Sequence, residues 1–261
     1  ETYRLSLNEL RDLPAVTTDD QTVELLGNIE FPDEAPSVVA NGAAGVGLYR
    51  TEFLYLERDD PPTEEEHFEA YSECVRGLNG LSLVIRTLDL GADKYGTEER
   101  EGRRPIRERN PFLGLRSLRY TLRRPELFRP QLRAILRASA LGDVRVMFPL
   151  VTSVHEFRHA RMLLGDIMED LSEEGIPFNR EIKVGMMVET PASAIMAEVF
   201  AREADFLSIG TNDLVQYTLA VDRTNERVND LFQPTHPAVI RMVRETVRGA
   251  RRHGTPVSCC G

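Results

Sequence analysis

One segment of the sequence concentrates residue types that handle charged substrates. It runs from Ser208 to Arg223 and places an amide, Asn212, and a carboxylate, Asp213, directly after a short apolar run. The guanidinium group of Arg223 follows ten residues after that carboxylate. Glu189 closes an earlier apolar run of the same kind, 24 residues before Asp213. Two carboxylates, an amide and an arginine in this order suit a divalent cation bound beside a phosphorylated substrate.

Two earlier apolar runs end alike, in an arginine followed by a threonine. The arginines are Arg50 and Arg86. Consecutive parallel strands lie about 4.8 Å apart, so we expect these guanidinium groups to be neighbours that repel unless an anion joins them. The alternative is that Glu52 and Asp89 neutralise them as ion pairs. The repetition of the arginine–threonine pair favours an anion site.

Glu189 and Asp213 close two consecutive strand candidates, so their carboxylates are expected to converge at one edge of a sheet. Converging carboxylates raise the pKa of one member or bind a cation. Mg²⁺ is the natural candidate, because it takes one or two carboxylates together with substrate oxygens and water. The alternative is that Glu189 caps a helix and Asp213 begins the next one.

Cys260 ends the last strand candidate, at the same edge of the sheet. Strand alternation sends Cys259 and Cys260 to opposite faces, so at most one of them reaches the site. A thiol placed there can donate or accept a proton. The alternative for Cys260 is a buried, inert side chain.

Short apolar runs alternate with helical patterns along the chain and would position these groups. Strands are predicted at 23–30, 45–49, 81–88, 144–151, 182–188, 206–210 and 256–260. Helices are predicted at 33–43, 63–78, 111–140, 153–174, 190–204 and 236–253. Strands that alternate with helices imply a parallel sheet, because the connection between two parallel strands must cross over the sheet and usually contains a helix. The pattern therefore predicts an α/β fold, a TIM-type (β/α)8 barrel, whose active site lies at the carboxyl ends of the strands.

The same pattern predicts the domain organisation. Residues 1–21 have mixed polarity and are interpreted as a linker or leading segment, and residues 22–261 as the barrel domain. Only seven strand candidates occur, so we expect the barrel to be truncated before its last β/α unit. The charged loop at 91–110 would lie over the carboxyl ends of the strands.

Composition narrows the classes of partner. The chain has 261 residues, 41% of them apolar and 28% charged, and a net charge of −10, which argues against nucleic-acid binding. It has no apolar stretch near the roughly 18 residues that span a bilayer, which argues against membrane insertion. Its three cysteines form no metal-binding or disulfide pattern, which favours a cytoplasmic setting.

Five motifs in order resemble the PEP-binding barrel of the phosphoenolpyruvate-protein phosphotransferase family, known as Enzyme I of the sugar phosphotransferase system. They are GLYRTEFL at 47–54, IRTLD at 85–89, NPFLGLR at 110–116, VETP at 188–191 and the segment 208–223. The resemblance covers residues 22–261. The tract 216–223 resembles Enzyme I more than its relatives, pyruvate phosphate dikinase and phosphoenolpyruvate synthase.

The resemblance implies roles for the residues that contact the substrate. It implies that Arg50, Arg86 and Arg223 hold the phosphoryl group of phosphoenolpyruvate (PEP). Arg116 resembles a further substrate-contacting arginine, and Asn212 would also contact the substrate.

It also implies a metal, a proton donor and partners. Glu189 and Asp213 would bind Mg²⁺, with Asp213 also near the substrate, and Cys260 would protonate C3 of the enolate to give pyruvate. The accepting histidine of the family lies on a separate N-terminal domain, which also docks the carrier protein HPr, and the family forms homodimers. No histidine here has the sequence context of that acceptor. We therefore expect this chain alone to bind PEP but not to phosphorylate HPr.

Two other functions compete with this one. The first is the PEP domain of a dikinase or synthase, which would need a nucleotide-binding domain in the same protein. The second is a non-catalytic, PEP-sensing dimerisation module, against which Cys260 and Arg223 argue.

Overall fold

A single parallel sheet organises the molecule. The computed structural model describes residues 10–56, 58, 60–90 and 109–261. Within them, seven strands pair in parallel in sequence order, from β1 to β7. The strands are β1 (Gly27–Ile29), β2 (Gly45–Arg50), β3 (Ser82–Arg86), β4 (Val144–Phe148), β5 (Lys183–Val188), β6 (Phe206–Gly210) and β7 (Val257–Cys260). The predicted alternation is confirmed, and so is the truncated, barrel-like α/β class.

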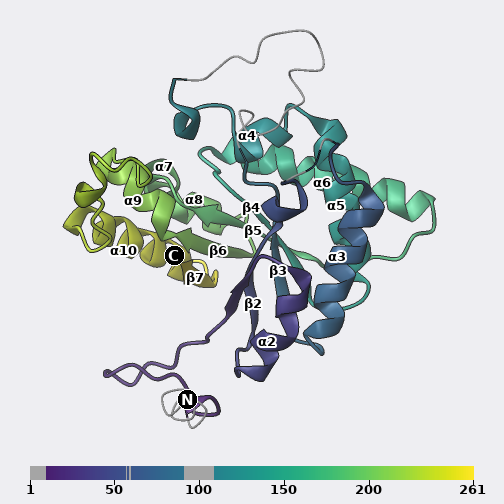
Figure 1. The fold of residues 1–261 in the computed structure, drawn as a ribbon, viewed down its shortest axis with the longest axis horizontal. Helices are drawn as coiled ribbons and strands as arrows, with labels where there is room; N and C mark the ends of the chain where they lie inside the picture. Colours follow the sequence, from purple (N-terminus) through teal and green to yellow (C-terminus); the bar gives the residue numbers. More distant parts are fainter. Residues whose placement is uncertain (1–9, 57, 59, 91–108) are drawn as a thin grey trace.

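Helices connect the strands and cover the outside of the curled sheet. In Figure 1, α3, α5 and α6 lie to the right of the strands, and α7, α8, α9 and α10 to the left. The α-helices are α2 (Ala35–Ala40), α3 (Glu64–Gly77), α4 (Ser117–Thr121), α5 (Pro125–Ser139), α6 (Val154–Glu173), α7 (Pro191–Ile195), α8 (Ala197–Ala201), α9 (Thr211–Leu219) and α10 (Pro237–Arg251). The 3₁₀ turns are η1 (Pro32–Glu34), η2 (Thr51–Leu54), η5 (Pro111–Leu113) and η6 (Asn229–Leu231).

Two of the predicted helices are divided into shorter helices in the structure. The range 111–140 contains three pieces, η5, α4 and α5. The break between α4 and α5 falls at Arg124, because a residue before proline avoids helical torsion angles. The range 190–204 divides at Met196, where ψ is 11°. Helix α9 was not among the predicted helices. It begins directly after β6, so its first turn lies at the carboxyl edge of the sheet.

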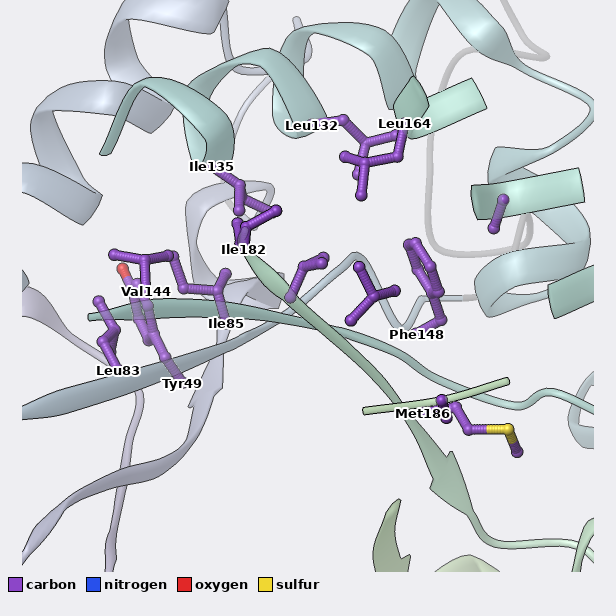
Figure 2. Close-up of a cluster of buried hydrophobic side chains, with 14 of the residues drawn as sticks. Tyr49, Leu83, Ile85, Leu132, Ile135, Val144, Phe148, Leu164, Ile182 and Met186 are labelled. Carbon is purple, nitrogen blue, oxygen red and sulfur yellow. The ribbon is translucent and has the colours of Figure 1, made fainter. Parts of the chain in front are cut away.

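The hydrophobic core has an outer and an inner part, because strand residues alternate between the two faces of the sheet. The outer part fills the space between sheet and helices, where side chains of α5 and α6 meet those of the strands (Figure 2). Labelled members are Tyr49, Leu83, Ile85, Leu132, Ile135, Val144, Phe148, Leu164, Ile182 and Met186. The inner part contains Leu48, Val84, Met147 and Met187, which fill the concave side beneath the site.

Some predictions fall on parts of the chain that the structure does not test. Most of the charged loop, residues 91–108, lies outside the described residues, as do residues 1–9. The boundary between residues 21 and 22 stays a prediction. Among the helices of the described ranges, none is long and apolar enough to cross a membrane. The three cysteines are free thiols.

Candidate functional site

The predicted site residues all line one cavity of about 410 Å³ at the carboxyl edge of the sheet. They are Arg50, Arg86, Arg116, Glu189, Asn212, Asp213, Arg223 and Cys260. Strand register explains the convergence, because Arg50 is the parallel partner of Arg86, and Gly210 is that of Cys260. A more open hollow of about 530 Å³, between residues 10–15 and 41–44, contains none of these groups.

Arginines and carboxylates alternate along one wall of the cavity. The guanidinium of Arg86 contacts Glu52 at 3.0 Å and Asp89 at 2.9 Å. Arg116 binds the other oxygen of Asp89, also at 2.9 Å. The ion pairs that were the alternative for Arg86 are therefore present. Asp89 joins Arg86 to Arg116 and offsets their mutual repulsion.

Burial and charge set the protonation states on this wall. Burial alone would raise the pKa of Asp89, but Arg86 and Arg116 outweigh it and hold that pKa below its usual value. Burial opposes the charge of Arg86, yet Glu52 and Asp89 raise its pKa, so the guanidinium stays charged. The wall is thus a fixed array of charges.

The same alternation continues toward α9. Asp213 lies 3.4 Å from Arg116 and 3.8 Å from Arg223. Arg50 pairs with Glu30 at 2.6 Å, where both side chains are about one-third exposed. That partner was not the predicted Glu52. Arg50 and Arg223 are the more accessible arginines of this cavity, so an entering anion meets them first.

The two predicted metal-binding carboxylates are deeply buried. Glu189 is 2% exposed, and its Oε1 accepts a hydrogen bond from the backbone N–H of Leu150 at 2.6 Å. Thr190, not Glu189, caps α7, so the capping alternative is wrong for Glu189. Asp213 does lie in the first turn of α9. A Cβ at Gly210 would lie 2.7 Å from Glu189 Oε2 and 2.7 Å from the methyl carbon of Met187, so a larger residue would displace these side chains.

The electrostatics of these carboxylates fit a divalent cation. The pKa of Glu189 is raised by burial and by the negative charges of Asp89 and Asp213. Burial also raises the pKa of Asp213. A cation would relieve this repulsion and favour both ionised forms. No cluster of three or more His, Cys, Asp or Glu suited to a metal occurs among the described residues.

The cysteine pair divides as strand alternation predicts. Cys260 lines the cavity, with Sγ 3.9 Å from Ser208 Oγ, whereas Cys259 is exposed. Burial raises the pKa of the Cys260 thiol above its usual value. The group therefore stays protonated near neutral pH and is available as an acid.

Sequence reasoning missed residues that support Arg116. Tyr217 accepts a hydrogen bond from Arg116 Nη1 at 3.3 Å and donates one to the carbonyl oxygen of Phe112 at 2.5 Å. The Phe112 ring lies 5.6 Å from the guanidinium carbon. One signal was available in the sequence, because Tyr217 follows Asp213 by one helical turn and so lies on the same face of α9.

A comparison of the whole chain with sequence families gives one decisive match. Residues 4–261 match the family described as PEP-utilising enzyme, PEP-binding domain. The chain belongs to this family. Within the PEP-utilising enzymes, it is 49% identical over 255 residues to the phosphoenolpyruvate-protein phosphotransferase of Staphylococcus aureus strain MSSA476. It is 49% identical over 246 residues to the protein of that name from Priestia megaterium.

Coverage of these relatives is partial. The aligned regions include 98% and 94% of this chain but only 44% and 42% of the two relatives. This PEP-binding domain therefore spans less than half the length of the curated relatives it matches.

Solved structures support the fold. An HpcH/Hpal aldolase/citrate lyase family protein from Burkholderia cenocepacia J2315 has a TM-score of 0.52 at 15% identity, over 98% of this chain and 83% of that one. Macrophomate synthase has a TM-score of 0.50 at 14% identity, over 97% and 74%. At these identities the likeness concerns the fold alone.

Proposed function

We propose that this chain is the PEP-binding catalytic domain of a phosphoenolpyruvate-protein phosphotransferase. The alternation of arginines and carboxylates around one cavity carries the proposal, because phosphoryl transfer depends mainly on positioning and charge neutralisation. The name shared by the 49% identical relatives supports it over a dikinase or synthase. In the complete protein, the phosphoryl group would pass to a histidine on another domain and then to HPr, in the cytoplasm.

The arginines bind and orient the substrate. Arg50, Arg86 and Arg223 hold the phosphoryl group of PEP, and Arg116 with Asn212 contacts the rest of the molecule. Planar guanidinium groups suit this task because they bind phosphate and carboxylate oxygens in pairs. Internal carboxylates hold Arg86 and Arg116 rigidly, so little side-chain entropy is lost when the anion binds.

Glu189 and Asp213 would hold Mg²⁺, which when bound stabilises negative charge on the substrate oxygens. In the transfer step, the bond between phosphorus and the enol oxygen breaks, and a bond from phosphorus to the histidine nitrogen forms. The enolate of pyruvate remains. Cys260 donates its proton to C3 of that enolate, pyruvate leaves, and solvent returns a proton to the thiolate.

Binding calorimetry on the complete gene product tests the proposal. We expect PEP to bind in the presence of Mg²⁺ and to bind more weakly when the metal is chelated. Arg50→Gln should weaken binding about 10- to 100-fold, the range for lost hydrogen bonds to a charged group. Arg158→Gln is the matched control, because Arg158 pairs with Glu203 on the outer surface. Absence of PEP binding to the unaltered protein would refute the proposed function.

The neighbouring cysteines provide a test of the chemical step. Cys260→Ala should lower PEP turnover by about 10²- to 10⁴-fold, the usual contribution of a positioned acid. Cys259→Ala should leave turnover near the unaltered value, because Cys259 is exposed and outside the cavity. Steady-state release of pyruvate measures both. Equal turnover in Cys260→Ala and the unaltered protein would refute the role of Cys260 as the proton donor. Binding of PEP without release of pyruvate by the unaltered protein would instead support a PEP-sensing module.

The relatives' name leaves oligomeric state open. We propose a homodimer for the complete protein on the family resemblance, and sedimentation analysis checks it.

A further inference from the structure

A buried glutamine of α5 ties together the strand ends that carry Arg50 and Arg86. Gln131 is 0% exposed, and its Oε1 accepts a hydrogen bond from the backbone N–H of Leu88 at 3.0 Å. Its Nε2 donates to Thr51 Oγ1, also at 3.0 Å. Thr51 directly follows the arginine of β2, and Leu88 follows that of β3 by two residues. We propose that Gln131 is a positioning residue, which sets the spacing of the two arginines that receive the anionic substrate.

The donors and acceptors fix the orientation of the amide. The N–H of Leu88 can only donate, so the atom that faces it must be the amide oxygen. The hydroxyl of Thr51 donates its proton to the carbonyl oxygen of Arg86 at 2.9 Å, which leaves its lone pairs for Gln131 Nε2. The glutamine therefore reaches the Arg86 backbone through a single hydroxyl group.

The second amide proton continues the network into α3. Gln131 Nε2 also donates to the hydroxyl of Tyr71 at 3.2 Å. The Tyr71 hydroxyl is hydrogen-bonded to His67 Nδ1 at 3.0 Å, and His67 Nε2 lies 3.1 Å from the hydroxyl of Tyr55. Every one of these side chains is at most 5% exposed. Both amide protons and the amide oxygen are thus used, which locks the glutamine in one rotamer.

A carboxylate makes the matching connection on the cavity side. Glu52 accepts a hydrogen bond from the backbone N–H of Asp89 at 3.0 Å and binds the guanidinium of Arg86. The end of β3 is therefore held to the segment after β2 from the cavity side by Glu52 and from the α5 side by Gln131. Small displacements of such groups reduce catalytic efficiency strongly, because binding geometry must be held to well within about 1 Å.

The inference rests on the proposed function for its ligand, which is PEP with Mg²⁺. In the complete gene product, Gln131→Leu keeps the approximate volume but removes all three hydrogen bonds. We expect it to weaken PEP binding about 10- to 100-fold, as loss of an outer partner does at other preorganised sites. Leu132→Ala is the matched control, because Leu132 is the adjacent, fully buried residue of α5 and belongs to the outer core. It should lower the unfolding temperature and leave PEP affinity nearly unchanged.

A second variant adds a pH readout that a purely structural role would not move. In Gln131→Glu, the protonated acid can still accept from Leu88 and donate to one hydroxyl. Its ionised form has no proton to donate. We therefore expect PEP affinity, expressed as a ratio to the unaltered protein at each pH, to fall as pH rises and the introduced acid ionises. This variant also serves if Gln131→Leu does not fold.

The combined effect of substitutions at Thr51 and Gln131 on PEP affinity provides the last readout. Thr51→Val removes the hydroxyl that joins Gln131 to Arg86, so losses of affinity in Thr51→Val and Gln131→Leu should be far from additive. The inference is overturned if Gln131→Leu binds PEP like the unaltered protein, or if affinity in all variants follows the unfolding temperature alone. Failure of the unaltered protein to bind PEP refutes the proposed function instead.

Discussion

At the scale of single residues, Asp89 has the most demanding position in the cavity. Its side chain is 7% exposed and lies between two guanidinium groups at 2.9 Å each. Charge burial is costly, so such a carboxylate stabilises the fold only while both partners remain in place. Without this carboxylate, the buried guanidinium groups of Arg86 and Arg116 would repel one another. The same carboxylate keeps two substrate-binding groups rigid.

Removal of that negative charge should be strongly destabilising. We expect Asp89→Asn to lower the free energy of unfolding by about 3–5 kcal/mol, because it removes the charge shared by two buried guanidinium groups and leaves Arg86 with Glu52 and Arg116 with Asp213. Asp143→Asn is the matched control, since Asp143 pairs with Arg145 at the surface with 46% of its side chain exposed. That change should cost less than about 1 kcal/mol. Urea denaturation measures both, and equal losses would contradict this account of the wall.

His67 makes folding stability depend on pH. Burial lowers its pKa from 6.5 to about 3, so the folded protein keeps the ring neutral. The unfolded chain takes up a proton below pH 6.5, and stability therefore falls as pH decreases from 6.5 toward 3, by up to about 1.4 kcal/mol per unit. Above pH 6.5 this contribution is constant. His67→Gln should reduce the slope of the unfolding free energy against pH, which urea denaturation at several pH values measures. A slope equal to that of the unaltered protein would disprove the assignment.

At the scale of elements, each strand ends where its neighbour ends, and the following turn carries the functional group. β2 leads into η2, β5 into Glu189 and α7, and β6 directly into α9. This arrangement explains why residues far apart in sequence share one cavity. It also explains the glycine at 210, where the backbone must pass close to the Glu189 carboxylate.

Substitutions at two helical glycines are expected to have opposite effects on stability. A Cβ at Gly165 in α6 would meet no atom within 4 Å, so Gly165→Ala should stabilise the protein by about 0.5–1 kcal/mol through helix propensity. A Cβ at Gly249 in α10 would lie 2.7 Å from the backbone nitrogen of Glu198 in α8. Gly249→Ala should therefore destabilise it by about 1–3 kcal/mol. Thermal unfolding compares the two, and the same sign for both would contradict the packing.

At the scale of the whole molecule, the net charge of the chain and the charge at the cavity differ. The net charge is −10, yet the cavity presents four arginines. Internal carboxylates neutralise most of that positive charge in the free protein, so specificity for an anion depends on geometry rather than on a broad positive field. This is the opposite of a nucleic-acid surface, where an extended basic patch supplies the affinity.

The sequence by itself determined the alternation of elements, the parallel class of the sheet and the chemistry gathered at its carboxyl edge. Those features depend on local periodicity and on the ends of apolar runs, which are visible at Arg50, Arg86, Glu189 and Asp213. It did not separate α4 from α5, and it offered a helix at Asp213 only as an alternative, because short helices carry weak periodic signals.

Only the tertiary structure decided which groups pair. Asp89 bridges two arginines, Glu30 is the partner of Arg50, and Gln131 reaches two strand ends from α5. These contacts join residues separated by up to about 80 positions, for example Gln131 and Thr51. Side-chain direction and helix placement fix such contacts, and neither is encoded in local spacing.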